Sequence, residues 1–341
     1  MSIPHARTLP GVVLVVIGVL TALGPLSLDA YLPGFPSLAE DLGVGSAEVR
    51  LTLTACLVGV AAGQLVAGPV SDALGRRLPL IVGAGAYALA SVACALAPSL
   101  PALVALRLVQ GLMLAVGVVS ARAVINDSAT GPLAVRYFSQ LATAAALAPV
   151  VAPLLGTAML ALGGWRAVFV ALAVLGAALA ALIATTFRET LPREARHPLA
   201  LSRTVRSFAE LGRDRAFVVN VVIGVMGGAA LFSYVAGSSF VVQTLFGAEP
   251  WQFALLFSLN GVGIAAFSQV NARVGPRWGT ARMLRLAFSL QSAGALAVLA
   301  IAAWGPREPG TIPWLAVAFF LVAAPLGLIN PSFMSRAMER S

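Results

Sequence analysis

Nine long, uncharged, apolar runs limit what this chain can fold into. Each reaches the roughly 20 residues that a helix needs to cross the hydrocarbon core of a bilayer. A tenth run, 108–121, becomes long enough only if Arg107 is included, and we therefore predict ten membrane-spanning helices. The nine runs cover residues 8–28, 51–71, 78–106, 137–165, 167–187, 216–248, 250–272, 286–306 and 309–335.

The composition agrees with a membrane protein. Hydrophobic residues make up 59% of the chain, charged residues make up 10%, and the mean hydropathy is +0.93. Strands of a transmembrane barrel alternate apolar and polar residues, whereas these runs are continuously apolar and rich in Ala, Leu, Val and Gly. We predict an all-α, multi-pass membrane protein. The first run is too long for a removable signal peptide and is expected to stay in the membrane.

The distribution of arginine predicts the orientation. All 22 basic residues are Arg, and the formal net charge is +9. With the N-terminus in the cytoplasm, 18 of them lie in inner segments, three lie outside (Arg50, Arg166 and Arg307), and Arg107 lies within a span. Cytoplasmic loops carry an excess of basic residues, so we predict the inner (plasma) membrane with both termini in the cytoplasm. This explains the basic charge without a nucleic-acid partner.

The longest polar segment divides the chain. It predicts an N-terminal six-helix bundle (1–187), a cytoplasmic linker (188–215) and a C-terminal four-helix bundle (216–341). The linker either lies on the inner membrane surface, where Arg meets anionic lipid, or is a disordered loop held inside by its charge. The loop "GPVSDALGRRLP" (68–79) has a degenerate counterpart six spans later, "NARVGPRWGTARM" (271–283). This indicates two related halves, of which the second lacks two spans.

Two charged residues stand inside the predicted spans. Burying an ionised carboxylate in hydrocarbon costs several kcal/mol, so we expect Asp29 to face a cavity or a partner and to exchange protons. Arg107 shares a helix face with Gln110, and Asp29 is its nearest anionic candidate by depth. The alternatives are that Asp29 marks the outer end of the first span and that Arg107 reaches the outer interface.

Acidic residues near the inner ends of the spans are candidates for ion pairs. Asp72, in "GPVSDALGRR", could cap a helix or pair with Arg76, and such a contact would hold one conformation. Asp127 could form a structural pair with Arg122, Arg136 or the two Arg residues of that loop.

The fifth span carries prolines and small residues. In "ALAPVVAPLLGT" (146–157), Pro149 and Pro153 bend the helix, and Gly156 permits close crossing by another helix. We predict a packing seam that can rock.

Polar residues in the seventh and eighth spans have two equally good interpretations. Tyr234, Ser238 and Asn260 could line a central cavity, or they could make polar contacts between helices. The sequence has no nucleophile elbow, no HExxH and no GxxxxGK[ST] motif, so we expect neither an enzyme nor an ATP-driven pump.

Several of these motifs resemble those of one transporter family. "GPVSDALGRR" resembles the loop between helices two and three of the major facilitator superfamily, "RLVQG" its fourth-helix motif, and the fifth span its antiporter motif. The stretches "LDAYLPGFP", "APVVAPLLG", "GWRAVF" and "ETLP" resemble the drug-efflux branch named for bicyclomycin and chloramphenicol resistance (Bcr/CflA).

The resemblance implies a fold and a mechanism. The fold is a pair of pseudo-symmetric helical bundles with twelve helices, of which about ten are expected here, as in a C-terminally truncated chain. The mechanism is alternating access that exchanges protons for small amphipathic drugs, driven by the proton motive force without a cofactor, in a monomer in the lipid bilayer. Trp165 and Arg166 are expected to be structural.

The same resemblance assigns roles to individual residues. These are proton coupling by Asp29 and Arg107, a conformational latch of Asp72, Gly75, Arg76 and Arg77, an antiporter seam of Pro149, Pro153 and Gly156, and a substrate cavity with Tyr31, Gln110, Tyr234, Ser238 and Asn260 as candidates. Two other functions stay open. The chain could export one specific metabolite, such as a sugar or an amino acid, or it could be a truncated membrane protein that transports nothing.

Overall fold

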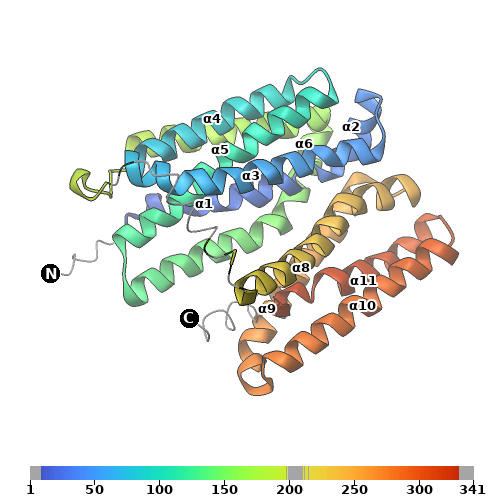
Figure 1. Ribbon diagram of the computed structural model, residues 1–341. Coiled ribbons are helices and arrows are strands. Elements are labelled where there is room, and N and C mark those ends of the chain that lie inside the picture. Colours follow the sequence, from blue (N-terminus) through green and yellow to red (C-terminus); the bar gives the residue numbers. More distant parts are fainter. Residues whose placement is uncertain (1–8, 197, 199–209, 211, 214, 330–341) are drawn as a thin grey trace.

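The computed structural model describes residues 9–196, 198, 210, 212–213 and 215–329, and every regular element among them is a helix (Figure 1). The first group of helices comprises α1 (Gly11–Asp29), α2 (Phe35–Leu42), α3 (Ser46–Leu74), α4 (Arg77–Ala95), α5 (Leu100–Ser128) and α6 (Gly131–Thr186). The second comprises α8 (Arg215–Phe240), α9 (Pro250–Trp278), α10 (Thr280–Trp304) and α11 (Ile312–Ala323). Short helical segments are η1 (Leu32–Gly34), η2 (Arg193–Ala195), the π-helical η3 (Val241–Leu245) and η4 (Pro309–Thr311).

The number of membrane-spanning helices is close to the predicted ten. Eight helices within the described residues are long and apolar enough to cross a bilayer. One of them, α6, is 56 residues long and is interrupted at Gly163 and Gly164, where Gly164 has a φ of +66° that favours glycine. Each part of α6 exceeds the length of a membrane span. The helix α8, 26 residues long, corresponds to the remaining predicted span.

One helix was not expected from the sequence. The segment after the first apolar run continues through η1 into α2, and its residues Tyr31, Leu32 and Phe35 are fully buried. Proline is compatible with the first turn of a helix, where the missing N–H has no intrahelical partner, and α2 ends at Gly43 with a φ of +63°. The segment therefore extends α1, and α2 packs against α3, α6 and α8.

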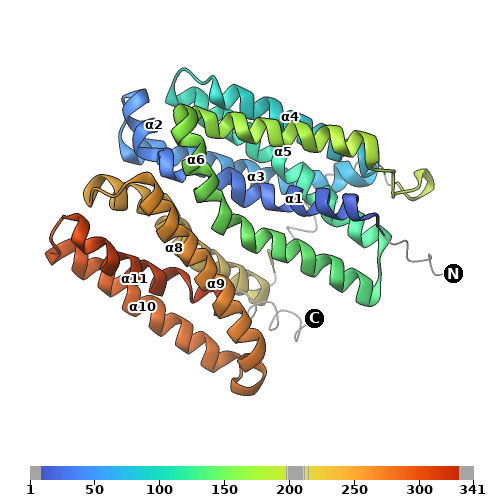
Figure 2. The same ribbon diagram turned by 180° about the vertical axis from the view of Figure 1, so that it is seen from behind.

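The helices pack as two groups that meet along α6 and α9. In the first group α3 packs on α5, and α6 packs on α1 and α4, while in the second group α10 packs on α11. Seen from behind, α6 runs between α1 and α9 (Figure 2). The predicted domain boundaries stay a prediction, and residues 197, 199–209, 211 and 214 of the predicted linker, 188–215, lie outside the described residues.

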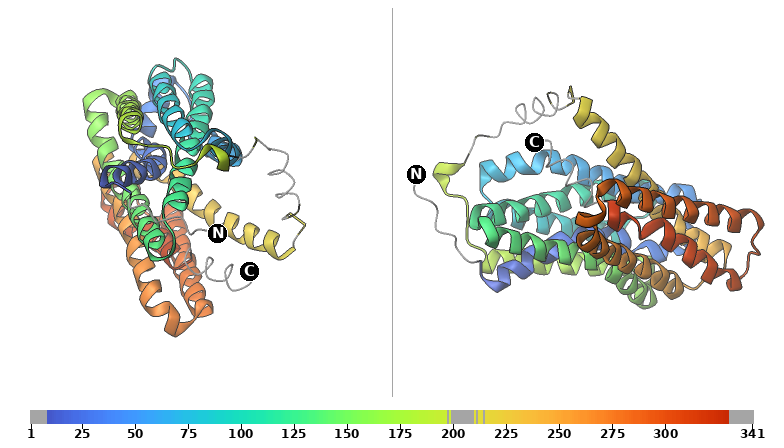
Figure 3. Two further views of the ribbon diagram at one scale, coloured as in Figure 1. Left: turned by 90° about the vertical axis from the view of Figure 1, so that its left-hand side faces the viewer. Right: turned by 90° about the horizontal axis from the view of Figure 1, so that it is seen from below.

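The two groups are joined mainly at one end of the molecule, which we call the α2 end. There the Ser239 hydroxyl donates a hydrogen bond to the backbone oxygen of Leu32 at 2.6 Å, and the rings of Phe35 and Phe240 lie 5.8 Å apart. The opposite end, which we call the linker end, carries the start of α1 and the end of α6. Toward it, the first part of α8 diverges from the first group in both views of Figure 3. The described structure is thus closed at the α2 end.

Candidate transport site and the network at the linker end

Arg107 is fully buried within α5. Its guanidinium donates hydrogen bonds to Oε1 of Gln110 at 2.5 Å and to the backbone oxygen of Ser27 at 3.1 Å. Its Cζ lies 4.5 Å from the ring centroid of Tyr31 and 5.6 Å from that of Phe169, so two aromatic rings also face the charge. Arg107 therefore does not reach a water interface, and neutral groups stabilise its charge.

A second layer of polar side chains holds the partners of Arg107. Gln110 donates to the Ser91 hydroxyl at 2.7 Å, and Ser91 donates to the backbone oxygen of Tyr87 at 2.8 Å. The Tyr87 hydroxyl shares a hydrogen bond with the hydroxyl of Ser27. Sequence reasoning missed Ser27, Tyr87 and Ser91. The available signal was the occurrence of isolated polar side chains inside apolar runs, which in a membrane require a partner.

Asp29, the last residue of α1, is also buried, with 8% of its surface exposed. It lies two residues beyond Ser27, roughly 200° around the helix, and therefore points away from Arg107. The Asp29–Arg107 pair expected from their depth is not formed among the described residues, because α5 meets a different face of α1. The carboxylate instead lies close enough to Tyr234 of α8 for an electrostatic interaction.

The polar residues of the second group make a contact between α8 and α9. Asn260 donates a hydrogen bond to the Tyr234 hydroxyl, and its own Oδ1 is buried with no hydrogen-bond partner in the described part of the chain. The Tyr234 ring stacks on Phe257 at 5.7 Å and lies 5.0 Å from Phe319. Ser238 is buried and bonds to the backbone of its own helix. Tyr234 and Asn260 thus lie together, with one acceptor atom still available.

The predicted seam residues of α6 face α1. Pro153 and Gly156 are buried and Pro149 is half-buried. A Cβ at Gly156 would lie 1.7 Å from the backbone oxygen of Ala30, so only glycine permits this approach. Next to the seam, α6 also contacts α9 of the second group. The seam therefore lies where the two groups of helices meet.

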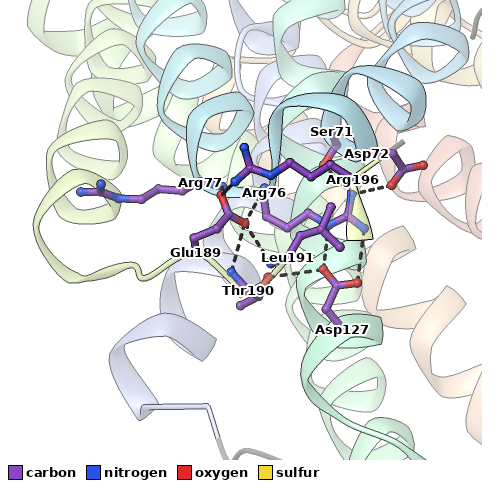
Figure 4. Close-up of polar contacts among 9 residues, drawn as sticks. All are labelled: Ser71, Asp72, Arg76, Arg77, Asp127, Glu189, Thr190, Leu191 and Arg196. Atoms are coloured by element: carbon purple, nitrogen blue, oxygen red, sulfur yellow. Dashed lines mark hydrogen bonds and ion pairs between the residues drawn. The ribbon is translucent and has the colours of Figure 1, made fainter. Parts of the chain in front are cut away.

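Arg76 is the centre of an ion-pair network at the linker end (Figure 4). Its Nε donates to Asp127 at 2.7 Å, and its Nη1 donates to Asp72 at 2.6 Å and to Ser71 at 3.1 Å. The predicted Asp72–Arg76 pair is therefore present, and Asp127 pairs with one of the arginines proposed for it. The Asp127 side chain is 17% exposed and that of Asp72 is 50% exposed, so Asp127 is the better shielded partner.

Glu189 extends this network, and sequence reasoning missed its role although it begins the "ETLP" motif. Its carboxylate accepts backbone hydrogen bonds from Arg76, Arg77, Thr190 and Leu191 and forms an ion pair with Arg196 at 3.5 Å. Burial acts to raise the pKa of Glu189, but the backbone N–H groups and Arg196 outweigh it and lower the pKa.

Gly75 turns the chain beside this network with a φ of +90°. Arg77 donates to the backbone oxygen of Ala184 at 2.7 Å.

A smaller cluster fixes α2 to the second part of α6. Asp41 accepts a hydrogen bond from Nε1 of Trp165 at 3.1 Å and forms an ion pair with Arg166. The contacts with Arg166 and Trp165 lower the pKa of Asp41. These contacts agree with the structural role expected for Trp165 and Arg166, while Asp41 was not identified from the sequence.

The fold and the buried charges define a multi-pass helical membrane protein with ionisable groups held in its interior. The sequence model of the Major Facilitator Superfamily matches residues 17–341. The chain belongs to this superfamily of transporters, as the motifs predicted.

Similar proteins support the drug-efflux branch of the family. The chain is 38% identical to the "Uncharacterized MFS-type transporter YdgK" of Bacillus subtilis and 31% identical to the "Bicyclomycin resistance protein homolog" of Haemophilus influenzae. Each match covers 95% of this chain and 80% of the relative. The "Multidrug resistance protein MdtL" of Escherichia coli is 31% identical over 71% of this chain and 61% of its own.

Solved transporters share the fold. The xylose transporter XylE from E. coli, in a partially occluded inward open conformation, has a TM-score of 0.68 at 16% identity, and the match covers 95% of this chain and 87% of XylE. A bacterial homolog of the human lysosomal transporter Spinster, in an inward-facing conformation, has a TM-score of 0.71 at 16% identity. This match covers 97% of this chain and 75% of the homolog. The predicted fold class is confirmed.

Proposed function

We propose that this transporter is a proton-coupled antiporter that exports small amphipathic drugs across the inner membrane by alternating access. The names of its bicyclomycin-resistance and multidrug-resistance relatives support the substrate class. The observation that carries the proposal is the burial of Asp29 without a cationic partner among the described residues, on the side of α1 that faces Tyr234.

Asp29 is suited to exchange a proton for a substrate. An ionised carboxylate inside a membrane protein is costly, and either a proton or a bound polar group relieves the cost. Tyr234 and the free Oδ1 of Asn260 lie on the opposite side of the interface. A substrate that contacts Asp29 and these groups competes with the proton, which couples export to proton entry.

Alternating access requires that the two groups of helices move relative to each other. In this proposal the bundles 1–187 and 216–341 rock about the seam of Pro149, Pro153 and Gly156. The linker end faces the cytoplasm, as the arginine distribution predicts for both termini. Asp72, Gly75, Arg76 and Arg77 hold one of the two conformations. Tyr31 and Gln110, predicted as substrate-cavity candidates, are fully buried against Arg107 and keep its guanidinium in place.

Efflux from everted membrane vesicles tests the proposal, with bicyclomycin and a panel of other antibiotics as substrates, with and without a proton uncoupler. Asp29→Asn should abolish pH-driven transport while membrane insertion persists. Asp41→Asn is the matched control, because Asp41 is an exposed acid in a surface ion pair, and it should retain transport within about twofold.

Three results would contradict the proposal. Undiminished proton-coupled efflux in Asp29→Asn would remove Asp29 from the mechanism. Transport of a single sugar or amino acid in place of drugs would identify a metabolite exporter. Absence of any transport by the wild-type chain, inserted and folded, would identify a protein that does not transport.

A further inference from the structure

A cavity of about 580 Å³ opens at the linker end, beside the ion-pair network but outside the proposed transport pathway. The end of α3, the start of α4 and the segment that follows α6 form its walls. One wall is polar and the other is apolar. The polar wall contains Arg77, Glu189, Arg193 and Arg196, and the apolar wall contains Leu74, Leu78 and Ile81.

The polar wall has more positive than negative charge. The lining contains three arginines and a single carboxylate, and Glu189 already accepts several backbone hydrogen bonds. The Nε atom of Arg196 is buried without a hydrogen-bond partner in the described part of the chain. The side chain of Arg193 is exposed and makes no hydrogen bond or ion pair with any described residue. The guanidinium of Arg193 therefore offers donors that no described residue uses to an anion in the cavity.

The apolar wall indicates what kind of anion the cavity fits. Leu74 and Leu78 are 46% and 49% exposed, and Leu78 begins the apolar surface of α4, which continues through the exposed Val82. In a membrane protein such a surface faces acyl chains. A soluble anion would gain nothing from this wall, and the cavity is much larger than inorganic phosphate needs.

We propose that this cavity binds the phosphate headgroup of an anionic phospholipid, with the acyl chains lying along Leu74 and Leu78. Guanidinium groups form paired, charge-assisted hydrogen bonds with phosphate oxygens, and basic side chains at the membrane surface attract anionic lipid. The cavity lies beside Glu189 and the backbone of Arg76, so the bound lipid would contact the segment that joins the two bundles.

Lipid binding by the purified full chain tests this inference independently of transport. Native mass spectrometry would count phosphatidylglycerol and phosphatidylcholine molecules, with identical acyl chains, retained by the protein. We expect preferential retention of phosphatidylglycerol. The double variant Arg193→Gln with Arg196→Gln should weaken that retention by about tenfold or more. The matched control, Arg273→Gln with Arg277→Gln, removes two exposed arginines of α9 at the same end of the molecule and should leave it unchanged.

Two further measurements keep the result unambiguous. The single variant Arg193→Gln alters a side chain without a described partner, so it should fold normally and lose part of the preference. Inorganic phosphate at millimolar concentration should not displace the lipid. Equal retention of phosphatidylglycerol by wild type and double variant, an equal loss in the α9 control, or displacement by inorganic phosphate would each overturn the proposal.

Discussion

The guanidinium of Arg107 donates a hydrogen bond to the backbone oxygen of Ser27 at 3.1 Å, whereas Asp29, two residues further along α1, forms no ion pair with it. The two intramembrane charges are thus separated by α1 itself. A change in the charge of Asp29 can leave the contacts of Arg107 intact. Any coupling between them passes through the position of α1, because Arg107 binds its backbone.

Replacing Arg107 by lysine should slow efflux although the charge is kept. Lysine cannot reach Gln110 and the backbone oxygen of Ser27 at once, since it lacks the planar fork of the guanidinium. A hydrogen bond to a charged group is worth about 1.5–3 kcal/mol, and about 1.4 kcal/mol is tenfold in rate, so we expect about a tenfold loss or more. The measurement is initial efflux in vesicles with equal protein content. Arg122→Lys, an exposed residue of the same helix, is the control. Wild-type efflux in Arg107→Lys would show that charge alone suffices.

The two acidic partners of Arg76 should contribute unequally to stability. Asp127→Asn removes the better shielded partner and should lower the free energy of unfolding by about 1–3 kcal/mol. Asp72→Asn removes a half-exposed partner and should cost less than about 1 kcal/mol, as surface pairs do. Chemical unfolding in mixed micelles measures both. A larger loss in Asp72→Asn would mean that Asp72 is shielded in solution.

The sequence predicted the helices better than the contacts between them. Apolar length is a local property, so the spans could be found, and the break in α6 lies close to Arg166, where the predicted runs divide. The contact of Arg107 with Ser27 and that of Gln110 with Ser91 could not be found, because each forms only through the crossing of separate helices. Similar depth in the membrane suggested Asp29 as the partner of Arg107. Depth does not specify the direction in which a side chain points around its helix.

The contact between Gly156 and Ala30 should make α6 sensitive to a single methyl group. A Cβ at Gly156 would overlap the backbone oxygen of Ala30, which cannot move without shifting α1. We expect Gly156→Ala to cost about 1–3 kcal/mol of stability and to impair efflux. Gly24→Ala in α1 is the control, since its Cβ would meet nothing within 4 Å, and it should be neutral or slightly stabilising. Equal stability of the two variants would show that the helices separate here at little cost.

Closure at the α2 end predicts that a cross-link there blocks transport. The rings of Phe35 and Phe240 belong to different groups of helices and lie 5.8 Å apart, so cysteines at these positions should be joined by a short bifunctional thiosulfonate. The native thiols Cys56 and Cys94 are buried and free, and replacing both by alanine gives a clean background. Cross-linking Phe35→Cys with Phe240→Cys should abolish efflux, because the substrate cannot leave while this end is closed, and a reducing agent should restore it. The single variant Phe35→Cys, treated identically, should keep its activity. Full efflux by the cross-linked protein would mean that the α2 end does not open during export.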